Sequence, residues 1–115
     1  MSPSPMEETT VISDVLASLP VTPSATTSRT LLDNEAVRVV VFTFDTGEQL
    51  TEHTASPPVV VQLVQGRMRF RVAGQDHNLA AGDCVYLAPK EPHALEAIEP
   101  SVLSLIMLRT APGRE

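Results

Sequence analysis

Residues 59–72 read VVVQLVQGRMRFRV, two strand-like runs on either side of Gly66. In residues 67–72 arginines alternate with apolar residues, and successive side chains of a strand point to opposite faces. The alternation predicts a strand whose apolar face points into a core and whose arginines face solvent, where ion pairs across strands are expected. Residues 59–64 are largely apolar on both faces, so we expect a second layer or a dimer partner to cover them.

Runs of similar length lie on both sides of this pair, separated by Gly, Pro, Asp and Ser. They are expected to be strands because apolar and β-branched residues dominate them and turn residues bound them. With roughly nine or ten strands and no helix between them, the chain from residue 29 onward is predicted to be all-β. A closed antiparallel barrel or jelly roll hides the strand edges best. The runs are 37–44, 49–54, 77–79, 84–87, 93–98 and 101–108.

The segment before these strands follows a different pattern. Residues 11, 12, 15, 16 and 19 are apolar at helical spacing, and Pro20 follows them. This predicts a short amphipathic helix that packs on the barrel or on a partner subunit. The predicted organisation is a tail, helix and extended connector over residues 1–28, one barrel over residues 29–108 and a tail over residues 109–115.

Composition narrows the class of partner. The 115 residues carry a formal net charge of −6 and include no Trp, one Tyr and three Phe, so neither electrostatics nor base stacking favours nucleic acid. No apolar run approaches the roughly 20 residues that a membrane helix needs, and no membrane association is expected. The single Cys84 cannot form an internal disulfide and residues 1–8 lack a basic stretch, which favours a cytoplasmic protein.

The spacing of glycines and histidines resembles a known motif. Gly47, His53, Ala55, Val59 and Gly66 follow one another at intervals that fit without a gap. The pattern is similar to the first cupin motif, Gly-x5-His-x-His-x3-Glu-x6-Gly. Two of the motif's polar positions are therefore occupied by apolar residues.

A second run of residues resembles the second motif of the same family, Gly-x5-Pro-x-Gly-x2-His-x3-Asn. Gly82, Ala88, Lys90, His93 and Ala97 stand at the same intervals. The chain thus resembles a small single-domain cupin, of the type-2 conserved-barrel kind, with degenerate metal-binding motifs. The resemblance implies an RmlC-like jelly-roll barrel, or double-stranded β-helix, preceded here by the short amphipathic helix.

The resemblance also implies a site. Family members with complete motifs bind a divalent metal through three His and one Glu. Here His53 and His93 keep two of these positions, while Ala55 and Val59 occupy the others. Catalytic metals usually have three protein ligands, or two His with a carboxylate. We therefore expect at most a weakly bound Zn, Fe, Mn or Ni on two imidazoles that face one mostly apolar interior cavity.

Two further residues are candidates for contacting a bound molecule. By alternation from His53, Gln49 shares its face and offers a carbonyl oxygen. Tyr86 offers a hydroxyl if its side of residues 84–87 is the interior. Prolines at 57–58, 89 and 92 are expected to stiffen loops that frame the entrance, and Lys90, the only lysine, lies in one of them.

Three functions remain open at this point. The first is a small cupin that binds a compact, largely apolar molecule through His53 and His93 without a tightly held metal. The second is a metal-dependent enzyme, an oxygenase or isomerase, with an incomplete His cage. The third is a non-catalytic regulatory or structural module that dimerises. A small-molecule ligand and a second copy of the chain are the partners that we expect.

Overall fold

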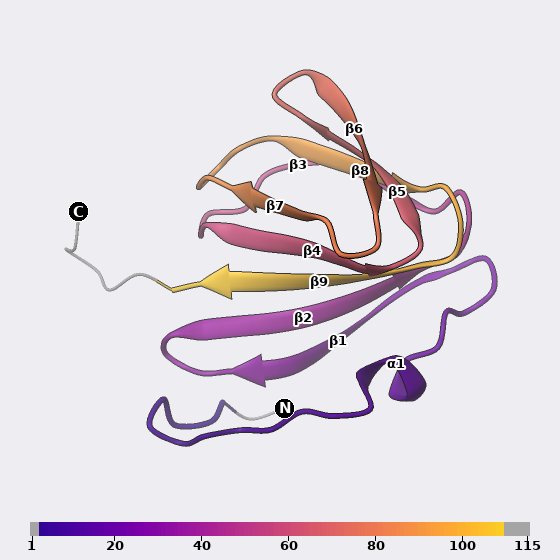
Figure 1. The fold of residues 1–115 in the computed structure, drawn as a ribbon. Helices are drawn as coiled ribbons and strands as arrows, with labels where there is room; N and C mark the ends of the chain where they lie inside the picture. The colour runs from indigo at the N-terminus through magenta and orange to yellow at the C-terminus, as the bar shows by residue number, and fades with distance from the viewer. Residues whose placement is uncertain (1–2, 110–115) are drawn as a thin grey trace.

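A computed structural model describes residues 3–109 of the chain (Figure 1). Within that range nine strands form two antiparallel sheets, in the orders β1-β2-β9-β4-β7 and β3-β8-β5-β6, and one short helix, α1 (Val15–Ser18), precedes them. The architecture is the all-β jelly roll that the spacing of the runs predicted. The strands are β1 (Thr26–Asp33), β2 (Val37–Phe44), β3 (Gln49–His53), β4 (Val59–Gln65), β5 (Arg67–Val72), β6 (Gln75–Ala80), β7 (Cys84–Leu87), β8 (His93–Ala97) and β9 (Ser101–Leu108).

The chain crosses repeatedly from one sheet to the other. Figure 1 shows β1, β2, β9 and β4 in one layer and β3, β8 and β5 in the other. Consecutive strands β2 and β3 belong to different sheets, as do β8 and β9. One end of the barrel therefore holds the start of β2, the end of β3, the start of β8 and the end of β9. We call this end the mouth, and we call the opposite end, with the turns at 45–48, 66 and 98–100, the closed end.

The inward faces of both sheets make the core. In β5, Met68 and Phe70 are fully buried, and burial of such side chains is the main stabilising contribution to a strand of this kind. The arginines of β5 lie on its other face beside carboxylates, with Arg69 Nη1 2.6 Å from Glu96 Oε1. The alternation of residues 67–72 therefore predicted the two faces correctly.

β1 begins earlier than predicted. Residues 26–28, expected as part of a connector, pair with the end of β2, and the hydroxyls of Thr27 and Thr43 hydrogen-bond across the two strands. Such Thr pairs stabilise neighbouring strands, but Ser and Thr are also common in loops. Composition therefore did not separate the connector from the strand, whereas the later strands agree with their predicted runs to within two residues.

The predicted amphipathic helix is a single turn. α1 has no buried residue, and Val11 and Leu16 are 87% and 45% exposed. Asp14 has a φ of 58°, in the left-handed region, which interrupts a helical path from residue 11. A helix this short has too few hydrogen bonds to be stable alone. The expectation that its apolar stripe packs on the barrel is therefore wrong for the described chain.

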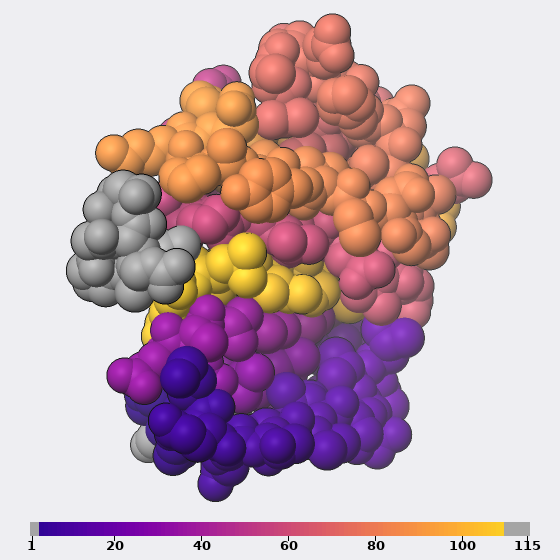
Figure 2. Space-filling model, turned by 60° about the vertical axis from the view of Figure 1, so that its left-hand side comes forward, coloured from indigo at the N-terminus to yellow at the C-terminus, as the bar shows by residue number. Residues whose placement is uncertain are grey.

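The outer face of the five-stranded sheet is more exposed to solvent than the apolar sequence of residues 59–64 predicts. Val60 is half-buried and Val64 is 39% exposed. In Figure 2 the N-terminal residues (indigo) lie along the side of β1 and β2, while β9 (yellow) and β4 remain visible beside them. The described chain supplies no second layer over this part of the sheet. The predicted residues 110–115 of the C-terminal tail lie outside the described residues.

Candidate functional site

His53 and His93 come together at the mouth of the barrel. His53 is the last residue of β3 and His93 the first of β8, and the two are direct partners across the strands. Their ring centroids are 4.2 Å apart and the ring planes are inclined by 57°. A single small molecule or ion can therefore contact both imidazoles.

The two histidines differ in burial. His93 is only 7% exposed, whereas His53 is exposed at the rim. Of the two rings expected to face an enclosed interior, only that of His93 is enclosed. His53 borders solvent. The pair thus joins the interior of the barrel to its entrance.

Each imidazole is held by the backbone two residues before it. His53 Nδ1 is 2.9 Å from the carbonyl oxygen of Thr51, and His93 Nδ1 is 2.9 Å from that of Glu91. A carbonyl oxygen can only accept, so each Nδ1 must carry the proton and donate it. In the neutral form of each ring, Nε2 then has the free lone pair. Both side chains are consequently prepared to accept a hydrogen bond, or to bind a metal, through Nε2.

The interior side of His93 is filled by the core. The ring of Phe70 lies parallel to the His93 ring, with the centroids 6.0 Å apart and an interplanar angle of 1°, and Phe70 is fully buried. Across the barrel, half-buried Leu105 and Met107 pack against the same core. The imidazole of His93 is therefore bounded by the apolar core on its barrel side.

A cleft of about 250 Å³ opens beside His93. The end of β3, the β5–β6 turn and the loop before β8 bound it, and Glu52, Glu91 and Arg71 are among the residues that line it. Arg71 lies on the solvent-facing side of β5, so this charged cleft is at the rim and outer side of the four-stranded sheet and not in the apolar interior. Glu52 and Glu91 line this cleft but were not among the predicted site residues, since neither is a motif position.

The register of β3 departs from simple alternation before His53. Its pairing with β8 shifts between Leu50 and His53, and such a bulge changes which face the following residues occupy. Gln49 pairs with Glu96, and Leu50 pairs with the buried Leu95 and packs on the core. The expectation that Gln49 shares the face of His53 is therefore wrong. Nothing in the sequence of β3 marks the bulge.

Tyr86 does not face the interior. It is 63% exposed and pairs with Val60. Its neighbour Leu87 is buried in the core, and successive residues of a strand point to opposite faces. The phenol therefore lies on the outer face of the five-stranded sheet, and the alternative in which its hydroxyl reaches the cavity is wrong.

The two motif loops are joined at the mouth. Lys90 N–H donates to the carbonyl oxygen of Ala55 at 2.7 Å. Lys90 stands where the second motif has Gly, and its φ is 67°, a backbone conformation that glycine adopts more easily. With Lys90 in place of the motif's glycine, the backbone keeps the conformation of the motif, with some strain at Lys90.

The donors at the site do not suit a firmly held metal. Ala55 has no ligating atom, and Val59 is an apolar residue with 2% exposure. Within residues 3–109 no group of three or more His, Cys, Asp or Glu side chains is arranged to hold a metal ion. Two imidazoles alone fall short of the three protein ligands of a usual catalytic site.

Comparisons with known proteins agree with this architecture. Residues 40–109 match the family model described as a cupin domain. Among curated proteins, none matches the sequence significantly. Within residues 3–109, no helix has the length and apolar character needed to cross a membrane.

Three solved structures illustrate the similarity of fold. A conserved protein of unknown function from Streptococcus pyogenes superposes with a TM-score of 0.79 at 22% identity, covering 96% of this chain and 97% of that one. A cupin superfamily protein from Desulfitobacterium hafniense gives 0.76 at 21% identity, covering 83% and 88%. Salicylate 1,2-dioxygenase from Pseudoaminobacter salicylatoxidans gives 0.69 at 15% identity, covering 79% of this chain and 28% of that one. Identities this low show a shared fold alone.

Proposed function

Since the chain belongs to the cupin family, we propose that it binds a small, largely apolar molecule at the mouth of its barrel through His53 and His93, without a tightly held metal. The observation that carries this proposal is the geometry of the pair. Two rings 4.2 Å apart, each with Nδ1 fixed on a backbone carbonyl, present two Nε2 acceptors to one ligand. Acceptors that are already oriented lose little entropy when they bind.

The surroundings of the pair support a compact ligand with an apolar body. Phe70 stacks behind His93, half-buried Leu105 and Met107 belong to the same apolar core, and the exposed His53 gives access from solvent. Binding sites of this kind combine apolar walls with a few oriented polar groups. The ligand would bury its apolar part between the sheets and donate a hydroxyl or N–H to the imidazoles.

A metal-dependent enzyme of the oxygenase or isomerase type is the second candidate. The free Nε2 atoms favour it, because Nδ1 donation to a carbonyl is a common support for metal-bound His. The missing ligands at Ala55 and Val59 count against it. Elemental analysis separates the two candidates, since stoichiometric Zn, Fe, Mn or Ni that disappears in His53→Gln would favour the enzyme and overturn the metal-free proposal.

The main proposal is tested by a thermal-shift screen of small neutral and anionic organic compounds on the full chain. A compound present at 100 times its Kd stabilises the folded state by about 2.7 kcal/mol. We expect the shift produced by any true ligand to disappear in His53→Gln and His93→Gln. His77→Gln is the matched control, because His77 is exposed on β6, two strands from β8. Ligands whose shift persists in both site variants would contradict the proposal.

We also propose that the chain is a homodimer that pairs through the outer face of its five-stranded sheet. Val39, Ile106, Val60 and Tyr86 occupy one row across four strands on this face, and Tyr86 is largely exposed. A two-fold dimer uses the same patch on both subunits, so a central apolar row is self-complementary. Light scattering that finds only monomers at micromolar concentration would refute this pairing.

A cytoplasmic location is consistent with the free thiol of Cys84.

A further inference from the structure

One charged side chain interrupts the apolar pattern of β2. Arg38 pairs with Met107 of β9, which in turn pairs with Val59 of β4. Val59 and Met107 both belong to the core side of the sheet, and residues directly opposite one another share a face. Arg38 therefore lies on the inner face of the barrel, in the same row as Val59.

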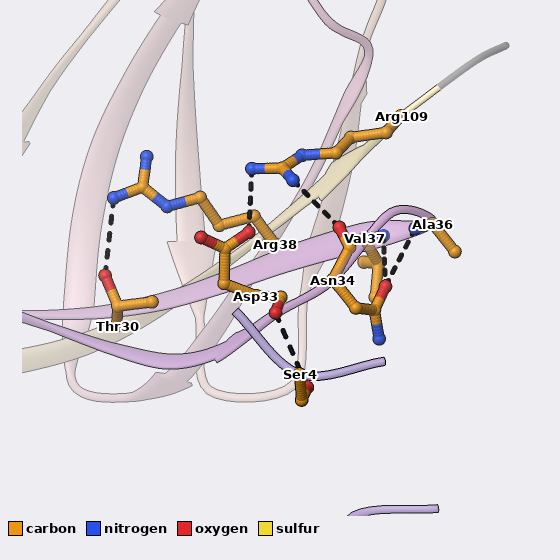
Figure 3. A network of polar contacts seen from close by, with 8 residues as sticks. All are labelled: Ser4, Thr30, Asp33, Asn34, Ala36, Val37, Arg38 and Arg109. Atoms are coloured by element: carbon orange, nitrogen blue, oxygen red, sulfur yellow. Dashed lines mark hydrogen bonds and ion pairs between the residues drawn. The ribbon is translucent and has the colours of Figure 1, made fainter. Parts of the chain in front are cut away.

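The polar network around Arg38 leaves its charge unbalanced. Asp33, the cross-strand partner of Arg38, instead forms an ion pair with Arg109, whose Nη2 lies 2.8 Å from Asp33 Oδ1. Arg109 Nη1 also donates to the carbonyl oxygen of Asn34 at 2.8 Å. Figure 3 shows both guanidinium groups on one side of the β1–β2 ribbon, with that of Arg109 above Asp33 and that of Arg38 beside Thr30. Asp33 therefore pairs with Arg109 and not with its cross-strand partner Arg38.

Arg38 itself has few partners. Its Nη2 lies 3.4 Å from Thr30 Oγ1, a long hydrogen bond, and its Nε is buried without a hydrogen-bond partner. Among residues 3–109 no carboxylate lies within ion-pair distance of this guanidinium. A buried donor that has lost its water without gaining an acceptor is costly, more so when the group is charged. An anion that accepts from Nε and a terminal nitrogen would remove this cost.

Arg38 and the histidine pair lie at the same end of the barrel. Arg38 is near the start of β2, and His53 is at the end of β3, the next strand of the chain, which lies in the opposite sheet. Phe42 of β2 and Leu50 of β3 pack on one core, so both strands border the same interior from different sheets. Arg38 therefore approaches the mouth from one sheet, and the imidazoles approach it from the other.

We propose that Arg38 binds the anionic group of the ligand, a carboxylate, while the rest of the same molecule reaches the imidazoles of His53 and His93. This inference rests on the proposed function for the histidine contacts, and it names the class of ligand, a small organic acid with an apolar body. The guanidinium suits a carboxylate because its planar donors match the two oxygens. Thr30 hydrogen-bonds the guanidinium, and Arg109 occupies the carboxylate of Asp33, so that the charge of Arg38 stays available for a ligand.

The test compares two probes whose hydroxyl can donate to the imidazoles, 4-hydroxybenzoate and its uncharged amide 4-hydroxybenzamide, which are called benzoate and benzamide below. Binding to the full chain is measured by titration calorimetry, and the Arg38 Nε–H resonance, assigned by its loss in Arg38→Lys, is followed by NMR. We expect benzoate to shift this resonance and to bind at least tenfold more tightly than benzamide. Arg38→Met should weaken benzoate binding by roughly tenfold to a hundredfold, the usual effect of losing a hydrogen bond to a charged group.

The matched control is Arg29→Met. Arg29 is exposed on β1 and pairs with Val41, on the opposite face from Arg38, so this variant should bind benzoate as the natural chain does. Equal affinity for benzoate and benzamide, or an unmoved Nε–H resonance in the natural chain, overturns the proposal even if Arg38→Met does not fold. Arg38→Lys keeps the charge but not the planar donors, and full benzoate affinity in it also counts against the proposal.

The histidine variants separate this inference from the function on which it rests. If benzoate binding falls in Arg38→Met but not in His93→Gln, the anion site stands and the histidine contacts do not. If binding falls in His93→Gln but not in Arg38→Met, the histidine site stands and the assignment of Arg38 is wrong. Loss of binding in both variants, with Arg29→Met unaffected, supports one molecule that spans the mouth.

Discussion

The closed end and the mouth of the barrel are built from the same strands but satisfy their polar groups differently. At the closed end the hydroxyl of Ser101 is fully buried and lies 2.7 Å from the carbonyl oxygen of Glu99. At the mouth, Arg38 Nε is buried without a partner and His53 is exposed. Lys90 also has a positive φ there. The buried hydroxyl at the closed end is thus paired, whereas the mouth keeps a buried donor without a partner and an imidazole open to solvent.

The difference indicates where the fold gains stability and where it can bind. Unpaired polar groups and unusual backbone conformations persist only when the surrounding structure holds them. The closed end, with its tight turns and buried side chains, can hold the two sheets together. The mouth can then keep a strained loop and an unpaired cation, which are the features that a ligand would use.

The largest effect is expected at Gly66 in the closed end. A Cβ atom built there would lie 2.3 Å from Ser101 Oγ and 2.4 Å from the carbonyl oxygen of Pro100, and the φ of Gly66 is 98°. Gly66→Ala should therefore lower the free energy of unfolding by roughly 3 kcal/mol or more, since it adds a backbone clash to the strain. Urea unfolding followed by circular dichroism measures the change.

Gly82→Ala isolates the contribution of the clash. Gly82 has nearly the same φ, 97°, but no atom lies within 4 Å of its added Cβ. We expect only the cost of a left-handed backbone, about 1–2 kcal/mol. Equal losses in the two variants would show that the closed end relaxes easily, and they would remove the contrast between the two ends.

A smaller effect of opposite sign is expected at the mouth. Lys90 is exposed and has a φ of 67°, so Lys90→Gly relieves backbone strain of about 1–2 kcal/mol. The extra freedom of glycine in the unfolded chain offsets about 0.4–1 kcal/mol of this gain. We expect the variant to be more stable by about 0.5–1 kcal/mol in the same unfolding experiment. A loss of stability would mean that the Lys90 side chain makes a contact that outweighs its strain.

The sequence predicted the strands well because alternation and turn residues record them directly. In β5 every second residue is an arginine, so the apolar residues between the arginines all point to the opposite face of the strand. The positions of His53 and His93 followed from motif spacing in the same way. Alternation, turn residues and motif spacing therefore identified most strands of the barrel.

The other features of the site depend on contacts between strands, which the sequence of one strand does not reveal. The bulge in β3 moved Gln49 to the outer face, and it arises from pairing with β8, not from the residues of β3. The unpaired state of Arg38 follows from the competition of Arg109 for Asp33, a contact between residues far apart in the chain. A lone arginine within the apolar run of β2 was nevertheless a visible signal in the sequence.

The smallest expected effect is a pH dependence at the closed end. Asp45 accepts hydrogen bonds from Ser24 N at 2.6 Å and Thr46 N at 2.8 Å. These bonds favour the carboxylate and lower the pKa of Asp45 below its ordinary value of 3.8. A group whose pKa is lower in the folded state contributes stability above its unfolded pKa and loses it as the pH falls through the folded value.

Asp45→Asn should therefore differ from the natural chain by a constant small amount between about pH 5 and pH 7, a range above the ordinary pKa of 3.8. The difference should shrink below that pKa, because the natural carboxyl group also becomes neutral there. Urea unfolding at a series of pH values measures it. A difference that stays the same below pH 3 would mean that it comes from the exchange of the carboxyl group for an amide and not from ionisation of Asp45. The turn would then tie the N-terminal connector to the closed end by geometry alone, without help from charge.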